Sequence, residues 1–345
     1  MSEPVALKLT AKDFKSDQEV RWCPGCGDYA ILAAVQQFMP ELNIPRENIV
    51  FVSGIGCSSR FPYYMNTYGM HSIHGRAPAI ATGLSVSRPD LSVWVVTGDG
   101  DALSIGGNHL IHALRRNVDL KILLFNNQIY GLTKGQYSPT SEVGKITKST
   151  PAGSADAPFN PLSLALGAEA TFVGRTIDSD RKHLQSVLRA AAEHSGSAFV
   201  EIYQNCNIFN DGAFEQLKEP STRDDHLIRL EHGQPITFGK DGQFCVVHPP
   251  GGFGLEVRET ASTPAEEIVV HDATVDDPAY AFALSRLPGF DLRNTPIGVF
   301  RSVCRPSYDS VVQGQLADAK ATVSETPEQQ LAGLLNGGDT WTIVG

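Results

Sequence analysis

Residues 91–127 read LSVWVVTGDGDALSIGGNHLIHALRRNVDLKILLFNN, and this pattern sets the fold class. Residues 91–97 and 120–125 contain the continuous apolar runs VWVV and ILLF, as expected of strands that are buried on both faces of a sheet. Between them, residues 103–114 carry an amphipathic pattern that predicts a helix. A strand, a helix and a second strand in this order predict one βαβ unit of a parallel sheet.

The same rhythm extends on both sides, from Asp28 to Asn205. Helix and strand patterns alternate over residues 28–39, 49–53, 162–166, 170–173, 182–192 and 198–203. We therefore expect an α/β fold, a parallel sheet with helices on both faces. Beyond Asn210 the pattern changes to a hairpin at 236–238 and 244–247 and a helix at 313–335. This predicts a ligand-binding domain, residues 1–210, and an accessory C-terminal extension, residues 211–345.

Composition excludes several classes of protein. The chain has 345 residues, is 41% hydrophobic and carries a formal net charge of -10, with no basic stripe to follow a phosphate backbone. Nucleic acid is therefore not an expected partner. No apolar run is long enough to span a bilayer, so we expect no membrane association and a cytoplasmic protein. Six cysteines in a reducing compartment are to be interpreted as ligands or nucleophiles first.

Four short segments follow predicted strands directly: residues 54–57, 98–101, 126–127 and 204–206. Ligands of open α/β sheets bind beyond the carboxyl ends of the strands, so these segments are expected to meet at one edge. Gly98 and Gly100 allow close approach to a diphosphate, and Asp99 and Asn127 offer the oxygen ligands that suit Mg²⁺. The alternative is an ordinary Asp-Gly turn with an unrelated Asn pair.

The cysteines add a second kind of site. Cys23 and Cys26 form a C-x-x-C loop before a helix, and Cys57 and Cys206 lie at the predicted sheet edge. Four cysteines suit a structural zinc ion or a [4Fe-4S] cluster. Zinc is the usual occupant of Cys₄ sites, and it remains an alternative at this stage. Dinucleotide-binding and P-loop motifs are absent from the sequence.

The run from Gly98 to Asn127 resembles the thiamine-diphosphate motif, Gly-Asp-Gly through Asn-Asn, in residue types, order and separation. This resemblance implies that Asp99 and Asn127 bind Mg²⁺ through their side chains and Ile129 through its carbonyl. A cluster that accepts electrons fits beside thiamine better than a redox-inert zinc ion does.

From Arg21 to Asn210 the chain resembles the β subunits of 2-oxoacid:ferredoxin oxidoreductases, particularly those for 2-oxoglutarate. The matching runs are residues 22–27 (WCPGCG), 54–58 (GIGCS), 74–76 (HGR), 98–101 (GDGD), 127–136 and Cys206. The resemblance implies a thiamine-diphosphate-binding fold, with a [4Fe-4S] cluster on Cys23, Cys26, Cys57 and Cys206. It implies cofactor contacts from Ile55, Gly56, Cys57, Ser58, His74, Gly98, Asp99, Gly100, Asp101, Asn127, Ile129, Gly131, Leu132 and Thr133.

The implied reaction is the oxidative decarboxylation of 2-oxoglutarate to succinyl-CoA and CO₂, with coenzyme A as co-substrate and ferredoxin as electron acceptor, or the reverse carboxylation. The implied partner is an α subunit with the pyrimidine-binding and CoA-contacting domains, in a dimer of heterodimers that is active only as a complex. Three alternatives remain: pyruvate or another 2-oxoacid as substrate, a non-redox thiamine enzyme with zinc, and an electron-transfer or scaffold subunit.

Residues 130–136 follow the predicted metal ligands and carry one cation, Lys134. We expect Lys134, Thr133 and His74 to act at the reacting centre. Lys134 suits a substrate with a second carboxylate, since opposite charges about 4 Å apart attract by roughly 4 kcal/mol at an effective dielectric near 20. Alternatively, Lys134 points to solvent or meets coenzyme A phosphates. For His71 we expect a structural role.

Overall fold

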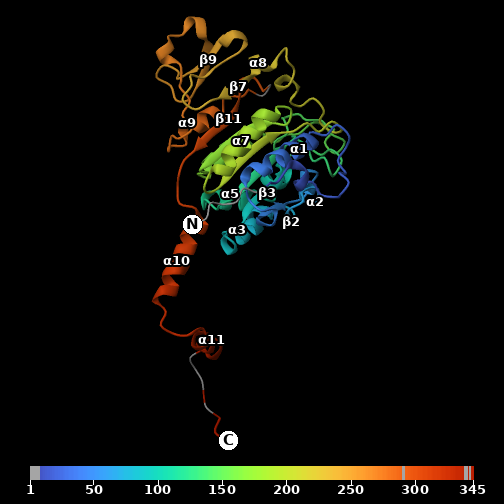
Figure 1. The fold of residues 1–345 in the computed structure, drawn as a ribbon. Helices are drawn as coiled ribbons and strands as arrows, with labels where there is room; N and C mark the ends of the chain where they lie inside the picture. The colour runs from blue at the N-terminus through green and yellow to red at the C-terminus, as the bar shows by residue number, and fades with distance from the viewer. Residues whose placement is uncertain (1–7, 290–291, 338–340, 342) are drawn as a thin grey trace.

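An eight-stranded sheet forms the centre of the computed structural model, which describes residues 8–289, 292–337, 341 and 343–345 (Figure 1). The other positions of the expected domains 1–210 and 211–345 lie outside the described residues. All neighbouring strands pair in parallel except β11 with β5. In spatial order the strands are β2 (Tyr68–His71), β1 (Ile49–Ser53), β3 (Ser92–Gly98), β4 (Lys121–Asn126), β6 (Ala198–Tyr203), β5 (Phe172–Ile177), β11 (Thr295–Ser302) and β7 (Leu227–Leu230).

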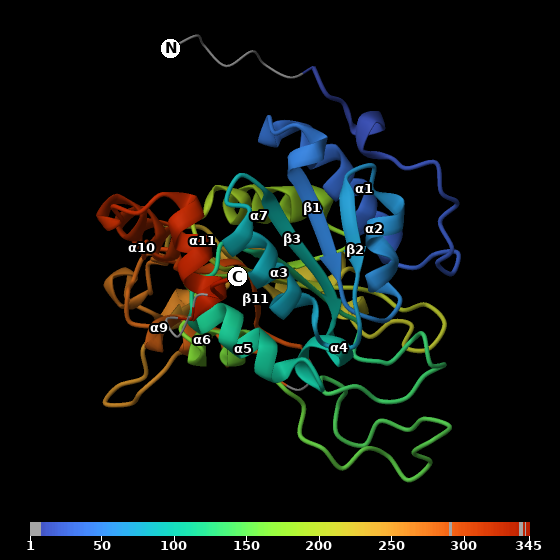
Figure 2. The same cartoon turned by 90° about the horizontal axis from the view of Figure 1, so that it is seen from below.

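Helices cover both faces of this sheet (Figures 1 and 2). Along β3, Val93 and Val95 belong to one buried core, and Trp94 and Val96 belong to the other. This double burial explains the continuous apolar runs in the sequence. The first core includes α3 (Ala77–Ser87), α5 (Gly107–Arg115), α6 (Pro161–Gly167) and α9 (Ala279–Ser285), and the second includes α1 (Asp28–Phe38), α2 (Phe61–Tyr64) and α7 (Arg181–Glu193).

The order of the strands opens a crevice between β1 and β3. These two strands are neighbours, but the chain leaves β1 toward β2 and leaves β3 toward β4, in opposite directions along the sheet. The loops after them therefore diverge, and ligands of open α/β sheets bind at such a switch point. The short helix α4 (Asp99–Leu103) begins directly after β3 at this place.

The helix expected over residues 103–114 is interrupted, and α4 and α5 are separate helices. The interruption coincides with a close approach of two loops, because a Cβ added to Gly75 would lie 2.5 Å from the backbone of Gly106. The helix expected over 313–335 is also divided, into α10 (Tyr308–Thr322) and α11 (Pro327–Asn336). Pro327 stands at the first turn of α11 and cannot continue the preceding helix.

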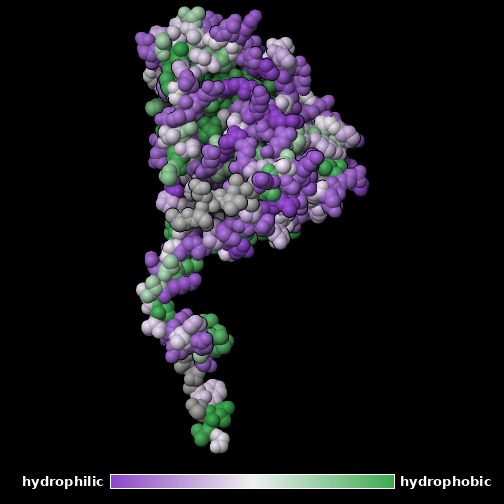
Figure 3. Space-filling model, viewed as in Figure 1, coloured by the Kyte–Doolittle hydropathy of each residue, from purple (hydrophilic) through white to green (hydrophobic). Residues whose placement is uncertain are grey.

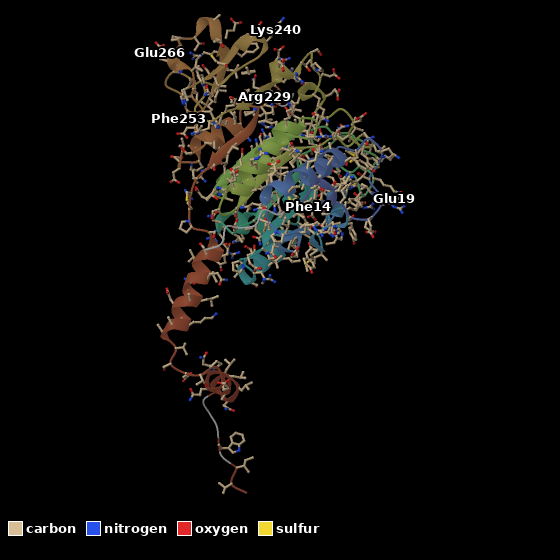
Figure 4. The ribbon with its side chains drawn as sticks, viewed as in Figure 1. Phe14, Glu19, Arg229, Lys240, Phe253 and Glu266 are labelled. Carbon is tan, nitrogen blue, oxygen red and sulfur yellow. The ribbon has the colours of Figure 1, made fainter. Side chains whose placement is uncertain are left out.

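The main sheet continues beyond residue 210, since β7 and β11 belong to it. The region 211–345 is thus not purely accessory. The helix α8 (Arg223–His226) directly precedes β7. Between β7 and β11 in the chain lies a lobe with an antiparallel sheet of β8 (Thr237–Phe238), β9 (Phe244–Val247) and β10 (Glu256–Glu259), which confirms the expected hairpin. Figure 4 places Phe253 and Glu266 of this lobe far from Glu19 on the main body.

The helices α10 and α11 form an arm that extends away from the body (Figure 1). None of the residues of α11 is buried. Figure 3 shows hydrophobic side chains along this arm, and the exposed ones include Leu316, Val323, Leu331, Leu334 and Leu335. No helix in the described part of the chain has the length and apolarity required to cross a membrane.

Candidate functional site

A cavity of about 300 Å³ lies at the switch point between β1 and β3. Its walls come from the loops after β1, β3 and β4 and from the segment after β2. All fourteen residues expected to contact the cofactor line this one cavity. Four further residues complete its walls: Ser104, Ile105, Phe125 and Tyr130.

Asp99 is the buried carboxylate of this cavity, at the first position of α4. Its Oδ2 accepts hydrogen bonds from Ser138 Oγ at 2.5 Å and from Thr140 Oγ1 at 2.6 Å. Burial raises the pKa of Asp99 to about 6, although both hydroxyls lower it. A cation would reverse this desolvation effect, because an adjacent positive charge favours the ionised carboxylate.

The turn after β4 presents Asn127 and Ile129 to the same cavity. Gln128 adopts a left-handed conformation with φ of 56°, and the backbone N–H of Ile129 donates to Asn127 Oδ1 at 3.2 Å. Asn127 Nδ2 donates to Gln204 Oε1 at 2.9 Å. The turn therefore places amide and carbonyl oxygens beside Asp99, which is a donor set typical of Mg²⁺ sites.

Asp101 also lines the cavity, but its carboxylate is bonded to the protein. Its Oδ1 accepts from the backbone N–H of Gly75 at 2.8 Å, and its Oδ2 accepts from Thr97 Oγ1 at 2.9 Å. A Cβ added to Gly54 would lie 1.8 Å from Oδ2, so only glycine fits there. Asp101 thus joins the loop after β3 to the Gly75 segment, and the Gly54 loop packs against its carboxylate.

The two histidines of the segment after β2 differ in their surroundings. His74 lines the cavity. The Nδ1 of His71 instead lies 3.0 Å from Ser53 Oγ and 3.0 Å from the Ser59 carbonyl oxygen, outside the cavity. These contacts agree with the structural role expected for His71.

The loops that carry the four expected cluster cysteines come together beside the cavity. A Cβ added to Gly131 would lie 3.5 Å from Cys57 Sγ and 3.7 Å from Cys206 Sγ. Asn207 Nδ2 donates to the Pro24 carbonyl at 2.7 Å, which joins the loop of Cys23 and Cys26 to the loop of Cys206. Gln204 Nε2 donates to Cys26 Sγ at 3.2 Å. Cys57 and Gly131 both line the cavity, so the cysteines adjoin its wall.

Burial controls the protonation state of two of these thiols, Cys26 and Cys57. It raises the pKa of Cys26, and it raises the pKa of Cys57 to about 12, with the Asp28 carboxylate adding to both effects. All four cysteines are free of disulfides. Among the described residues, no three His, Cys, Asp or Glu side chains are grouped closely enough to hold a metal ion as they stand.

Lys134 lies outside the cavity lining, on an exposed turn whose first residues do line it. Its backbone N–H donates to the Gly131 carbonyl at 3.0 Å, and its φ of 77° is left-handed. Thr133 lines the cavity and donates its hydroxyl to Gln136 Oε1. A larger and more open hollow, of about 620 Å³, adjoins the C-x-x-C loop and includes Cys26 and Lys218.

Sequence reasoning missed the hydroxyls of Ser138 and Thr140. They belong to the long connection between β4 and α6, which has no helix or strand. Their signal was weak, since a run of Ser, Pro and Thr is typical of any loop. The chain must fold back by about forty residues before they reach Asp99.

Comparison with known proteins agrees with this geometry. Residues 54–202 match the family described as thiamine pyrophosphate enzyme, C-terminal TPP binding domain. This range begins at the loop after β1 and includes the loops after β3 and β4. The fold and the cavity therefore define a thiamine diphosphate-binding subunit, as expected.

The chain is 66% identical to 2-oxoglutarate oxidoreductase subunit KorB of Mycobacterium tuberculosis, over 96% of this chain and 88% of that protein. It is 47% identical to the β subunit of 2-oxoacid:ferredoxin oxidoreductase 1 of Aeropyrum pernix, over 55% of this chain and 60% of that protein. The chain belongs to the family of 2-oxoacid:ferredoxin oxidoreductase β subunits.

A solved structure extends this comparison. The 2-oxoglutarate:ferredoxin oxidoreductase of Magnetococcus marinus, with 2-oxoglutarate, coenzyme A and succinyl-CoA bound, matches with a TM-score of 0.74 and 34% identity. The match covers 95% of this chain and 96% of that one. The likeness therefore includes regions beyond residue 210.

The junction formed by Asp101 leads to a prediction. Asp101→Ala leaves the Gly75 N–H and the Thr97 hydroxyl without this acceptor. We therefore expect the free energy of unfolding to fall by about 1–3 kcal/mol. Urea unfolding measures the change. Asp90→Ala is the control, because its ion pair with Arg88 is exposed and is worth about 0–1 kcal/mol. Equal effects of the two substitutions would contradict this role of Asp101.

Proposed function

We propose that this chain is the β subunit of a 2-oxoglutarate:ferredoxin oxidoreductase that binds thiamine diphosphate with Mg²⁺ and a [4Fe-4S] cluster. The supporting observation is that the two candidate sites share a wall. Cys57 and Gly131 line the proposed diphosphate cavity, and the sulfurs of Cys57 and Cys206 both lie next to Gly131. The proposed localisation of the chain is the cytoplasm, where thiols remain reduced.

The cavity residues fit a cation bound to a diphosphate. Asp99 and Asn127 supply side-chain oxygens, and Ile129 supplies a backbone carbonyl. Gly56 has nothing within 4 Å of its missing Cβ, so this loop leaves room for phosphate groups. His74 lies on the same lining and offers a donor to a phosphate oxygen. We assign Asp99, Asn127 and Ile129 to Mg²⁺ on these grounds.

The cysteines fit an iron–sulfur cluster by their number, type and placement. Cys23, Cys26, Cys57 and Cys206 come from three separate loops that meet at one edge of the sheet. Burial keeps Cys26 and Cys57 protonated, and binding of iron would displace those protons. A redox group beside a thiamine site also gives the two electrons of the reaction an acceptor, which zinc does not.

In the proposed reaction, bound thiamine diphosphate supplies the electron sink for loss of CO₂ from 2-oxoglutarate. The residues of this chain bind and orient it. Asp101 holds the Gly75 segment against the loop after β3, and Thr133 lines the cavity from the loop that carries Lys134. Succinyl-CoA forms with coenzyme A, and ferredoxin receives the electrons. The reverse carboxylation uses the same groups.

Lys134 is proposed to select 2-oxoglutarate through its distal carboxylate. Its φ of 77° is unusual for a residue with a side chain, and glycine would adopt it without strain. A lysine at such a position favours a functional reason for its cation. Its exposure in the single chain fits a residue that faces a substrate held between subunits.

The proposed partner is an α subunit that supplies the pyrimidine-binding and CoA-contacting parts, in a dimer of heterodimers. The chain shows one diphosphate motif and no second copy of it. The arm of α10 and α11 is proposed to pack on that partner, because its exposed leucines are not covered by the body. Alone, the chain is expected to be inactive.

One prediction separates the two cofactors. Asp99→Asn removes an anionic Mg²⁺ ligand at constant size, so the purified complex is expected to lose thiamine diphosphate while its iron content is unchanged. Cys206→Ser is expected to lower iron and acid-labile sulfide while thiamine diphosphate stays bound. Iron, sulfide and thiamine assays on the same samples check both. If each variant lost both cofactors equally, or zinc replaced iron, the proposal would fail.

A second prediction concerns the substrate. Lys134→Ala is expected to raise the KM for 2-oxoglutarate at least about tenfold, which corresponds to 1.4 kcal/mol, with little effect on pyruvate. Initial rates of viologen reduction with each 2-oxoacid measure the preference. Lys148→Ala is the matched control, since Lys148 is an exposed lysine in the following loop. An unchanged preference in Lys134→Ala would overturn the assignment.

A third prediction tests the arm. Deletion of residues 323–345 removes α11, which has no buried residue, so the melting temperature of the isolated chain is expected to stay unchanged. Capture of the co-expressed α subunit on a tagged β chain is expected to weaken strongly. Full capture by the shortened chain would show that the arm does not contribute to the interface.

A further inference from the structure

The Asp99 carboxylate is held by the hydroxyl of Thr140, which does not line the cavity and lies outside the sequence motifs. Thr140 is 3% exposed, and its Oγ1 lies 2.6 Å from Asp99 Oδ2 and 2.9 Å from Asn126 Oδ1. Ser138 Oγ adds a second contact to the same carboxylate oxygen. Neither Thr140 nor Ser138 lines the cavity, so both act on Asp99 from behind.

Asn126 connects this hydroxyl with the neighbouring turn. It is the residue before the expected Mg²⁺ ligand Asn127, and it is 2% exposed and absent from the cavity lining. Its Oδ1 accepts from the backbone N–H of Gln128 at 3.2 Å and lies 2.9 Å from Thr140 Oγ1, whose single proton can be donated to Asp99 Oδ2 or to this oxygen. Gln128 is the left-handed residue of the turn that presents Asn127 and Ile129. The Asn126 side chain thus links the Thr140 hydroxyl, which contacts Asp99, with the Gln128 turn.

A buried ion pair anchors Asn126 in turn. Asn126 Nδ2 donates to Glu201 Oε1 at 2.7 Å, and Arg175 Nε donates to Glu201 Oε2 at 2.7 Å. The side chains of Arg175 and Glu201 are 2% and 0% exposed. The guanidinium also lies over the rings of Tyr203 and Phe300. These partners leave the pair little freedom, so it forms a rigid base across β4, β6, β5 and β11.

We propose that Thr140 and Asn126 are positioning residues, which hold the Asp99 carboxylate and the Gln128 turn in one geometry for a divalent cation on a diphosphate. The proposed oxygen ligands come from two loops, Asp99 from the one after β3 and Asn127 and Ile129 from the turn after β4, so their relative direction depends on a support common to both loops. The hydrogen-bonded series from Arg175 to Asp99 supplies that support from the interior of the sheet. This inference rests on the proposed function, because it takes Asp99 as a cation ligand.

The series also explains why the long loop after β4 returns to the site. Ser138 contacts Asp99 through its hydroxyl. Its backbone N–H donates to Ser141 Oγ at 2.8 Å, which fixes the position of Ser138 in the loop. Ser141 Oγ donates to the Gln128 carbonyl at 2.6 Å. The loop therefore supports Asp99 and the Gln128 turn together, by three hydroxyls within four residues.

The test compares three variants of the complete α–β complex, with thiamine diphosphate and Mg²⁺ as the probes. Thr140→Val keeps the shape but removes the hydroxyl, and Thr140→Ser restores it. Thr171→Val is the matched control, because Thr171 is also buried and donates to a side-chain oxygen, that of Asn117 at 2.7 Å, away from the cavity. Calorimetric titration gives the cofactor Kd, and thermal unfolding and iron content are measured in parallel.

Thr140→Val is expected to weaken cofactor binding about 10- to 100-fold, the usual effect of removing a residue that orients a metal ligand. Thr140→Ser is expected to restore near wild-type affinity, and Thr171→Val is expected to lower the melting temperature without changing Kd. Wild-type affinity in Thr140→Val, or equal weakening in Thr171→Val, would overturn the proposal. Failure of the wild-type complex to bind thiamine diphosphate would instead overturn the proposed function.

Discussion

The central constraint in this molecule is that helices cover both faces of the main sheet. Trp94 and Val95, adjacent on β3, point into two different cores, so neither face has room for a polar ligand. Polar and charged groups can serve a ligand only where the strands end. Because β1 and β3 continue in opposite directions along the sheet, those ends form a crevice rather than a flat rim.

The carboxylates of Asp99 and Asp101 have different roles at this crevice, although they are only two residues apart in the sequence. Asp101 is bonded to Gly75 and Thr97 and joins loops, while Asp99 remains a cavity residue supported from behind by hydroxyls. The side chains of Asp99 and Asp101 point in different directions from α4, because successive residues of a helix are rotated by about 100°. A rigid loop framework and an available ligand thus come from one short segment.

The two candidate cofactor sites are close because one segment forms the wall between them. Gly131 lines the cavity, and a Cβ added to it would lie in ordinary van der Waals contact with the sulfurs of Cys57 and Cys206. Such proximity suits an enzyme that moves electrons from one group to the other. This arrangement of the two sites agrees with the similarity of the chain to 2-oxoglutarate oxidoreductases.

The sequence by itself determined most of the strands and helices through β6, although not β2, and the residues that gather in the cavity, because buried strands and glycine-rich ends leave strong local patterns. It did not reveal β7 and β11 as members of the sheet, or the separation of α4 from α5, because these depend on contacts with Phe172–Ile177 and with the Gly75 loop. Only the tertiary structure decided that Thr140 supports Asp99 and that Asp101 does not face a ligand freely. Hydrogen bonds between residues about forty positions apart are formed by folding and leave no periodic signal in the chain.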